Sequence, residues 1–479
     1  MLFNSIDFAI FLPIVFVIYW FIVNKNITLQ NGFIVFASYF FYACWDWRFL
    51  FLILFSTVTD YFVGLLLQKD YLQKKRKIIL AVSVVVNLSF LGFFKYYNFF
   101  VDNFVEVFRL LGSELNIHTL KIILPVGISF YTFQTMSYTI DVYKRKIEAT
   151  NDFIAFAGFV GFFPLLVAGP IERATNFLPQ FFVKRTFDYP KAVDGLRQIL
   201  WGLFKKVVIA DTCAVFVNQI FEQSDTLSGS TLVVGIVLFS FQIYGDFSGY
   251  SDIAIGLSRL FGFNPMRNFN FPYFSRDIAE FWRRWHISLT TWFRDYVYIP
   301  LGGSRVSRGK IIRNTFIVFL ISGFWHGANW TFVCWGGINA IFLIPSVIRK
   351  TNRKNLDTVA QGKLLPSLRD VSNILVTFVL ITFSWIFFRS RNIAQASHYI
   401  KSIFSASLFE KISVAPSLSF VLIFIFFILV EWFGREWQHG LEQFALKWKK
   451  WLRWLFYFVL VLLILAFSGS AQEFIYFQF

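Results

Sequence analysis

Apolar runs separated by short polar loops extend along almost the whole chain. About a dozen of these runs are long enough, or nearly long enough, to cross about 30 Å of hydrocarbon as helices. They lie at Phe8–Val23, Phe33–Cys44, Phe49–Leu67, Ile78–Phe100, Lys121–Tyr143, Phe153–Ala168, Leu196–Phe221, Thr231–Phe261, Ile311–Ile344, Ile374–Phe388, Leu418–Trp432 and Trp451–Phe467. The run at Ile311–Ile344 has room for a helical hairpin, and the longest polar stretches, Arg349–Asp370 and Arg389–Pro416, are only loop-sized. The pattern predicts an all-α polytopic membrane protein with one helical domain over residues 1–479.

The composition strengthens the membrane assignment. Of the 479 residues, 57% are hydrophobic, 21% are aromatic and 15% are charged, whereas soluble domains have about 25% charged residues. The first apolar run follows no basic segment and precedes no small-residue cleavage site, so we expect a membrane span and not a removable signal. The cysteines Cys44, Cys213 and Cys334 lack the spacing of a disulfide framework or a zinc site, and no metal is expected.

The formal net charge of +17 is carried mainly by short loops between the apolar runs. Loops of this kind stay on the cytoplasmic side of a membrane, so the charge indicates no nucleic-acid partner. The same residues would attract anionic lipid headgroups or a phosphate-rich donor such as a nucleotide thioester. We therefore expect Lys69–Lys77 and Lys144–Lys146 to be cytoplasmic, and Asp102–His118 to be external.

Strict alternation of sides would then place the basic region Arg173–Lys191 outside the cell. The run before it, Phe153–Ala168, contains Pro164 and is followed by a Gly-Pro pair. We therefore predict a broken, re-entrant element that returns to its own side, where surrounding protein buries its backbone. With this exception, Asn264–Arg313 lies inside and the C-terminus lies outside.

His326 lies within the apolar run Ile311–Ile344. An ionisable side chain at membrane depth costs several kcal/mol unless something compensates, so it is interpreted first as a functional site with chemistry inside the bilayer. If its helix starts near Ile311, about fifteen residues with a rise of about 1.5 Å each place the imidazole about 22 Å from that end. The alternative is a histidine that is hydrogen-bonded between helices.

Residues Arg276–Pro300 have the three-to-four-residue spacing of an amphipathic helix. The apolar positions are Trp282, Trp285, Leu289, Trp292 and Tyr296, and the charged positions include Arg276, Glu280, Arg283 and Arg284. We expect this helix on the cytoplasmic side, either as an interfacial anchor or with its basic residues facing a phosphorylated ligand. The pattern alone favours the anchor.

Five motifs, spread in order over nearly the whole chain, resemble the membrane-bound O-acyltransferase (MBOAT) family, and within it the bacterial branch of alginate O-acetyltransferases and teichoic acid D-alanyl transferases. The motifs are Leu124–Tyr131, Phe163–Pro164 with Ala168–Ile171, Gln242–Asp252, Phe281–His286 and Phe324–Gly327. The resemblance implies a ring of tilted helices, with re-entrant or interfacial helices, around a thinned centre. In such a fold a funnel from each face would meet at His326, with the acyl donor entering from the cytoplasm and the acceptor from outside.

This resemblance makes His326 the expected general base, which takes a proton from an alcohol or phenol as that oxygen attacks a thioester carbonyl. His286 matches a second polar position of the family, and it either supports the base and donor or closes a structural hydrogen bond. Asn329, one turn after His326, is a candidate donor to the developing oxyanion. Candidate donor-binding residues are Arg283, Arg284 and Trp285.

Asp246 and Asp252 interrupt the apolar run Thr231–Phe261. Carboxylates inside a membrane need partners. These two either line the cavity, where Asp246 could contact substrate and pair with an arginine or histidine, or form structural ion pairs between helices.

The aromatic tail Phe474–Phe479 is a further unusual feature. Aromatic residues at a membrane interface commonly act as anchors. The tail also resembles the terminal Phe-x-Tyr pattern of the small companion peptide in D-alanylation systems. On that resemblance, Tyr476 would reach the outer funnel and receive or guide the acyl group.

The sequence contains no Walker A loop, no His-Glu-x-x-His and no Gly-x-Ser-x-Gly motif, which argues against an ATP-driven pump or a serine hydrolase. One rival is a proton-coupled transporter or flippase that uses His326 and Asp246, but such proteins have paired broken helices in two related halves, and none are visible. The second rival is a polyprenyl-dependent membrane glycosyltransferase. Such an enzyme would require carboxylates in a sizeable outer loop, but the loop Trp45–Arg48 is short.

The resemblance further implies a multi-pass protein of the bacterial cytoplasmic (inner) membrane. It implies acyl-CoA, with acetyl-CoA favoured, as a donor substrate and no bound cofactor. The expected partners are membrane lipids, an extracytoplasmic acetyltransferase and a polysaccharide acceptor. Alginate, cellulose, peptidoglycan and teichoic acid all remain possible acceptors.

Overall fold

The computed structural model describes residues 1, 3–113, 115, 117, 119–167, 169–470, 472, 474 and 475. Every regular element in this part of the chain is helical, which confirms the all-α prediction. Contacts between residues divide the chain into two compact units. Unit 1 contains Met1–Ala192 and Leu257–Met266, and unit 2 contains Val193–Gly256 and Arg267–Phe479. The single domain over residues 1–479 stays a prediction.

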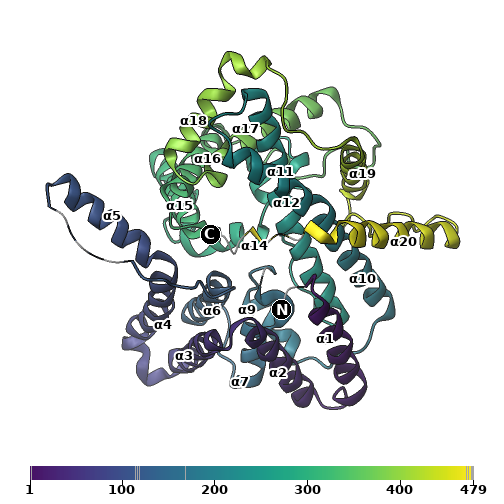
Figure 1. The fold of residues 1–479 in the computed structure, drawn as a ribbon. Coiled ribbons are helices and arrows are strands. Elements are labelled where there is room, and N and C mark those ends of the chain that lie inside the picture. Colours follow the sequence, from purple (N-terminus) through teal and green to yellow (C-terminus); the bar gives the residue numbers. More distant parts are fainter. Residues whose placement is uncertain are drawn as a thin grey trace. The chain divides into compact units, whose positions relative to one another are not determined.

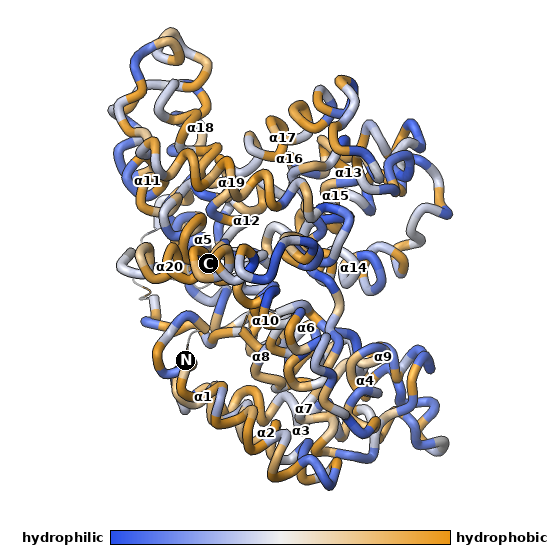
Figure 2. Tube along the Cα trace, turned by 90° about the vertical axis from the view of Figure 1, so that its right-hand side faces the viewer, coloured by the Kyte–Doolittle hydropathy of each residue, from blue (hydrophilic) through white to orange (hydrophobic). Residues whose placement is uncertain are grey.

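Six helical segments of the described chain are long and apolar enough to cross a membrane. They are Ile27–Gln68, Tyr71–Leu110, Gly229–Leu260, Trp330–Ile348, Leu368–Arg389 and Lys450–Phe467. Many large apolar side chains on these helices are exposed, including Leu375, Val379 and Leu462. Figure 2 shows hydrophobic residues along the helices and hydrophilic residues mainly in the loops. Exposed apolar surface of this extent fits a lipid environment.

Unit 1 is built from helices joined mostly by short turns (Figure 1). Its elements are α1 (Ile6–Val17), η1 (Ile18–Ile22), α2 (Ile27–Asp46), η2 (Trp47–Phe49), α3 (Leu50–Gln68), η3 (Asp70–Lys75), α4 (Arg76–Leu91), η4 (Gly92–Tyr96), α5 (Tyr97–Leu110), α6 (Ile128–Tyr143), α7 (Phe153–Gly161), α8 (Phe163–Leu166), α9 (Ala174–Phe177) and η5 (Leu178–Phe181). Helix α6 packs against α3 and α4, and α2 packs against α7.

A buried polar cluster joins three of these helices around Asn87 of α4. The Asn87 amide donates to Asp60 of α3 at 2.8 Å. Its oxygen accepts hydrogen bonds from Ser56 of α3 at 2.8 Å and from Thr135 of α6 at 3.3 Å. Because an apolar environment leaves buried polar groups without water, these bonds hold α3, α4 and α6 in one register.

Helices α7 and α8 form the broken element that the sequence predicts at Phe153–Ala168. The nine residues of α7 span only about 13.5 Å. The backbone leaves the helical conformation at Phe162, and Pro164 lies in the first turn of α8, where its missing N–H is tolerated. The buried amide of Phe163 donates to Ser38 Oγ of α2 at 3.0 Å. The break is confirmed, and the return to the same membrane side stays a prediction.

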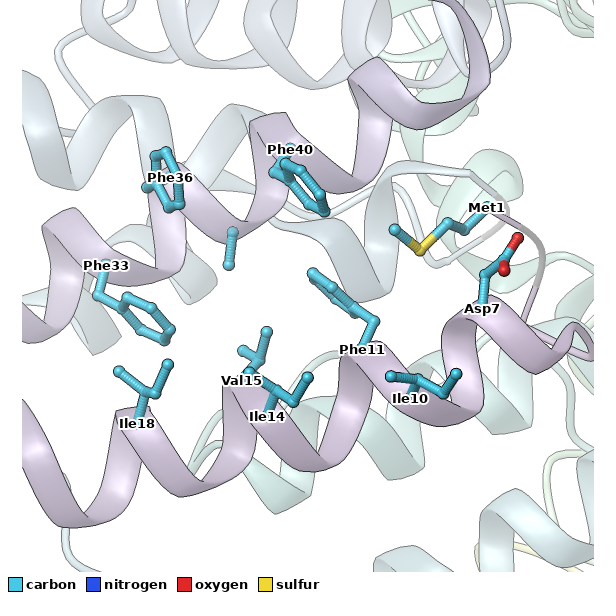
Figure 3. Close-up of a pocket in the computed structure, with 11 residues that line it drawn as sticks. Met1, Asp7, Ile10, Phe11, Ile14, Val15, Ile18, Phe33, Phe36 and Phe40 are labelled. Carbon is cyan, nitrogen blue, oxygen red and sulfur yellow. The ribbon is translucent and has the colours of Figure 1, made fainter.

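An apolar groove of about 380 Å³ lies between α1 with η1 and α2. Figure 3 shows Phe11 and Val15 pointing toward the helix that carries Phe33 and Phe40. The lining is apolar except at one end, where Asp7 lies. Such a lining suits a lipid acyl chain and offers few groups for chemistry.

Unit 2 holds every candidate site residue that the structure describes. Its elements are η6, a π-helix (Phe204–Ala210), α11 (Asp211–Glu222), η7 (Pro272–Phe274), α13 (Ile278–Arg284), α14 (Ile287–Phe293), η8 (Arg294–Tyr298), α15 (Arg308–His326), α16 (Trp330–Ile348), α17 (Leu368–Arg389), α18 (Ile393–Ile403), η9 (Ala406–Phe409), α19 (Leu418–Gly434), α20 (Lys450–Phe467) and η10 (Ser468–Ser470). Helices α10 (Tyr189–Leu203) and α12 (Gly229–Leu260) carry residues of both units. Helices α15 and α16 lie side by side (Figure 1), which confirms the predicted hairpin.

The predicted single amphipathic helix over Arg276–Pro300 is wrong. Two short helices, α13 and α14, flank Trp285 and His286, and His286 has a left-handed backbone with φ +43°. Asn268 accepts hydrogen bonds from the first residues of α14, which favours a break before this helix. Its carbonyl accepts from the Ile287 amide at 2.8 Å, and its side-chain oxygen accepts from the Ser288 hydroxyl at 2.9 Å. Of the five predicted apolar positions, Trp285, Leu289 and Trp292 are buried within the protein. Trp282 and Tyr296 are partly buried, so the spacing does not mark a face exposed to an interface.

Helices α15 and α16 approach each other so closely at Gly336 that a methyl group there would collide with the Phe319 carbonyl. We predict that Gly336→Ala destabilises the protein by about 1–3 kcal/mol, because the two backbones must separate. The measurement is the thermal midpoint of the purified protein in detergent. Gly337→Ala is the control, since its new methyl would lie 3.8 Å from the nearest atom, a Leu320 methyl. Equal midpoints for the two variants would contradict the close approach.

Candidate active site

His326 is the last residue of α15 and is 5% exposed. Aromatic rings from three successive helices surround its imidazole. The ring centroids lie 4.9 Å away for Trp325 of α15, 5.1 Å for Trp335 of α16 and 5.3 Å for Phe388 of α17. The enclosure limits the access of water to the imidazole, and the role of His326 as a general base stays a prediction.

The turn after His326 is compact because it contains small residues. A methyl group at Gly327 would collide with the Phe332 ring, and one at Gly323 would collide with the Phe332 carbonyl. The two glycines therefore let α16 fold back directly against the end of α15. This packing holds the His326 backbone in one position.

His286 is also buried, at 1% exposed. Its ring lies 4.6 Å from Phe247 of α12 and 6.2 Å from Trp325, measured between centroids. Trp325 thus contacts both imidazoles, and the structure brings the two predicted histidines to the same aromatic cluster. The left-handed backbone of His286 places its side chain there, which a continuous helix would not do.

The predicted donor-binding arginines contact a loop of the protein itself. Arg283 donates to the carbonyls of Asn352 and Asn355 at 2.5 and 2.6 Å. Arg284 pairs with Glu280 at 2.9 Å and donates to the Asp357 carbonyl at 2.8 Å. These guanidinium groups therefore hold residues 352–357 against α13. Their role in binding a donor stays a prediction.

Arg276 completes this attachment. It pairs with Glu280 at 3.1 Å and with Asp357 at 3.0 Å. Hydrogen bonding to the Arg276 guanidinium holds the pKa of the Asp357 carboxyl below its ordinary value. The loop is therefore tied down by charge as well as by backbone hydrogen bonds.

Trp285 and Asn329 have structural contacts in this state. Trp285 is 2% exposed, and its ring centroid lies 5.2 Å from that of Trp385. Asn329 caps α16 by accepting from the Thr331 amide at 3.0 Å, and its amide donates to the Arg391 carbonyl at 2.8 Å. Their proposed contacts with substrate stay predictions.

Asp246 and Asp252 of α12 both pair with lysines of η6. Lys206 Nζ lies 2.8 Å from Asp246 Oδ1, and Lys205 Nζ lies 2.6 Å from Asp252 Oδ2. The partners are lysines, not the arginine or histidine that the sequence suggested, and they join two helices as the structural alternative requires. The signal that could have revealed them is the Lys-Lys pair inside the predicted apolar run Leu196–Phe221. Substrate binding by Asp246 stays a prediction.

The aromatic tail is described only in part. Phe474 is fully buried, and its ring lies 4.4 Å from Tyr250 and 6.1 Å from Phe247. Because Phe247 contacts His286, the tail enters the aromatic cluster that holds the two histidines. Tyr476 lies outside the described residues.

The described residues include no cluster of three His, Cys, Asp or Glu side chains that could hold a metal ion. Of the aromatic residues around His326, the sequence motifs include Trp325 but not Trp335 or Phe388. Trp335 and Phe388 lie in ordinary apolar runs, where no local pattern distinguishes them from lipid-facing residues.

Comparison with known proteins gives a consistent result. Residues 144–388 match the model of the membrane-bound O-acyltransferase family. A probable alginate O-acetylase of Pseudomonas aeruginosa is 40% identical over 407 residues, which cover 85% of this chain and 75% of the relative. A peptidoglycan O-acetyltransferase of Helicobacter pylori is 37% identical over 432 residues, covering 84% and 80%. A teichoic acid D-alanyltransferase of Streptococcus thermophilus is more distant, at 29% over 283 residues, covering 55% and 68%.

The loop attachment by Arg283 can be tested by proteolysis. We expect Arg283→Ala to accelerate tryptic cleavage after Lys350, Arg353 and Lys354, because the loop loses two charge-assisted hydrogen bonds. The control is Arg294→Ala, since Arg294 is exposed and pairs with its neighbour Asp295. Cleavage is followed by mass spectrometry of the released peptides. Equal cleavage rates in the wild type and Arg283→Ala would show that Arg283 does not hold the loop.

Proposed function

Because this chain belongs to the membrane-bound O-acyltransferase family and is an O-acyltransferase, we propose that it moves an acetyl group from cytoplasmic acetyl-CoA toward an extracytoplasmic polysaccharide. The two O-acetylating relatives support acetyl over aminoacyl transfer, because both are more similar to this chain than the D-alanyltransferase. The proposed location is the bacterial inner membrane, with acceptors and a partner transferase on its outer side.

One observation carries the proposed chemistry. His326, an ionisable residue at the end of an apolar helix, is enclosed by aromatic rings within the segment that matches the family. In the proposed step, a neutral His326 imidazole accepts the proton of an acceptor hydroxyl. The hydroxyl oxygen bonds to the thioester carbonyl carbon, the carbon–sulfur bond breaks, and the coenzyme A thiolate takes up a proton. Limited access of water favours transfer over hydrolysis.

His286 is proposed to support this step from the opposite side of Trp325. The 6.2 Å separation of the His286 and Trp325 rings supports a role in shaping the cluster. Direct contact of His286 with the donor is the alternative, and a change in KM for acetyl-CoA in His286→Ala would favour it.

The proposed first acceptor is the phenol of Tyr476. Support comes from Phe474, two residues before it, which packs between Tyr250 and Phe247. An acetylated tyrosine would then pass its acyl group to an extracytoplasmic transferase, which delivers it to the polymer. This order requires the tail to face the outer side, as the loop charges predict.

The donor is proposed to enter from the cytoplasmic side. Coenzyme A carries several phosphate charges, and basic loops raise the local concentration of such a ligand. Acetyl-CoA acts as a substrate in this scheme, and no resident cofactor is needed for the transfer.

His326→Ala tests the proposal most simply. We predict a fall of about 10²–10⁴-fold in the rate of coenzyme A release from acetyl-CoA, because the general base is lost. The rate is measured with a thiol reagent on purified protein in detergent. The control is His398→Ala, which changes a half-exposed histidine of α18. Wild-type release by a folded His326→Ala variant would rule out His326 as the base.

A further inference from the structure

The described part of the tail is bound within unit 2. Phe474 is fully buried and Ile475 is 1% exposed. The side chain of Gln472 accepts a hydrogen bond from Asn218 of α11 at 3.5 Å. The described backbone of the tail also contacts the ion pair of Lys206 with Asp246.

Lys206 donates one of its hydrogen bonds to the tail. Its Nζ lies 2.7 Å from Asp211 Oδ1 and 2.8 Å from Asp246 Oδ1, and it donates to the Gln472 carbonyl at 3.1 Å. An ammonium group has three N–H donors, so one of the three is directed at the tail. Without the tail, that donor would lose its Gln472 partner in a buried environment.

Asp246 uses the tail in the same way. Its Oδ1 faces Lys206, and its Oδ2 accepts from the Ile475 amide at 2.7 Å. The carboxylate therefore contacts a lysine on one side and the tail backbone on the other. Because Asp246 is 2% exposed, water cannot readily replace the amide.

The neighbouring Lys205–Asp252 ion pair is formed without the tail. Asp252 pairs with Lys205 through Oδ2 at 2.6 Å and accepts from Gln198 through Oδ1 at 2.9 Å. Lys205 also donates to Ser248 at 2.9 Å. These contacts all come from α10, η6 and α12, and none of them involves the tail. The two adjacent lysines thus make one ion pair within the helices and one that the tail completes.

The ion pair lies next to the candidate active site. Asp246 and Tyr250 are four residues apart on α12 and share one face of the helix. Tyr250 packs against Phe474, and Phe247 lies between Phe474 and His286. A tail held at Asp246 is therefore held at a fixed distance from the aromatic cluster.

We propose that the Lys206–Asp246 pair is the binding site for the tail through Gln472 and Ile475, and that this binding serves to present the residue that follows, Tyr476, for acyl transfer. The positioning half of this inference rests on the proposed function, and the binding half does not. Lys206 and Asp246 are positioning residues in this scheme, because they act through the tail backbone.

Asp246→Asn tests the binding half. Lys206 and the Ile475 amide contact different oxygens of Asp246, and asparagine replaces one of these oxygens with an NH2 donor, so one of the two contacts is lost. The matched control is Asp252→Asn, which changes a carboxylate of the same helix that also accepts at both oxygens but does not touch the tail. Phe474→Ala is a second variant, which weakens tail binding without changing a charge.

Tail binding is measured with a nitroxide on Gln472→Cys, after Cys44, Cys213 and Cys334 have been replaced by serine. We expect an immobilised label in the parent and in Asp252→Asn. In Asp246→Asn and Phe474→Ala we expect the ratio of docked to released tail to fall about tenfold, the effect of losing one buried hydrogen bond or its packing equivalent. Each variant is first shown to be monodisperse in detergent. A label that stays immobilised in folded Asp246→Asn overturns the inference, whatever the activity.

The positioning half is tested by polysaccharide O-acetylation in cells. We expect Asp246→Asn and Phe474→Ala to lower it toward the level of Tyr476→Phe, and Asp246→Glu, which restores two acceptor oxygens, to recover part of it. A released tail with undiminished acetylation would overturn the positioning role and leave the binding site. If His326→Ala keeps its activity while Asp246→Asn releases the tail, the proposed chemistry fails and the binding site stands.

Discussion

Charged and polar groups in an apolar interior must find their partners within the protein, and this requirement organises unit 2. Lys205 and Lys206 are adjacent in η6 but pair with two different carboxylates of α12. Glu431 of α19 accepts hydrogen bonds from Trp201 and Tyr244 at 2.7 and 2.5 Å. Each contact joins two helices, so the cost of burying the charge is offset by fixing the helices relative to each other.

The same requirement shapes the surroundings of the two histidines. Their neighbours are mostly aromatic rings, which limit the access of water to the two imidazoles. The tight α15–α16 turn and the left-handed backbone at His286 bring residues from distant parts of the sequence to this cluster. The tail joins it through Phe474, and the Asp246 ion pair then connects the position of the tail with the position of α12.

Local patterns in the sequence predict those features that depend on local causes. The hairpin at Ile311–Ile344 follows from the length of one apolar run, and the break near Pro164 follows from the backbone chemistry of proline. The burial of His326 follows from its place inside an apolar run. The family resemblance added roles for the histidines that the pattern alone could not assign.

Features that depend on distant residues could not be predicted in this way. The break at Trp285 and His286 depends on hydrogen bonds from Asn268, which lies outside the periodic segment. The partner of Asp246 is a lysine from another helix, and the arginines expected to face a ligand bind a loop far along the chain. Periodicity records which residues are apolar, but it does not distinguish burial against protein from burial in an interface.

In the proposed scheme, acyl groups pass from one face of the membrane to the other through the His326 cluster. The most direct measurement uses inside-out membrane vesicles from cells that carry the protein and its partners, supplied on the outside with acetyl-labelled coenzyme A. We expect label to appear on polysaccharide inside the vesicles while free coenzyme A accumulates outside, with both signals lost in His326→Ala. Luminal label that is unchanged in folded His326→Ala, or no luminal label from active wild-type vesicles, would contradict transfer through this site.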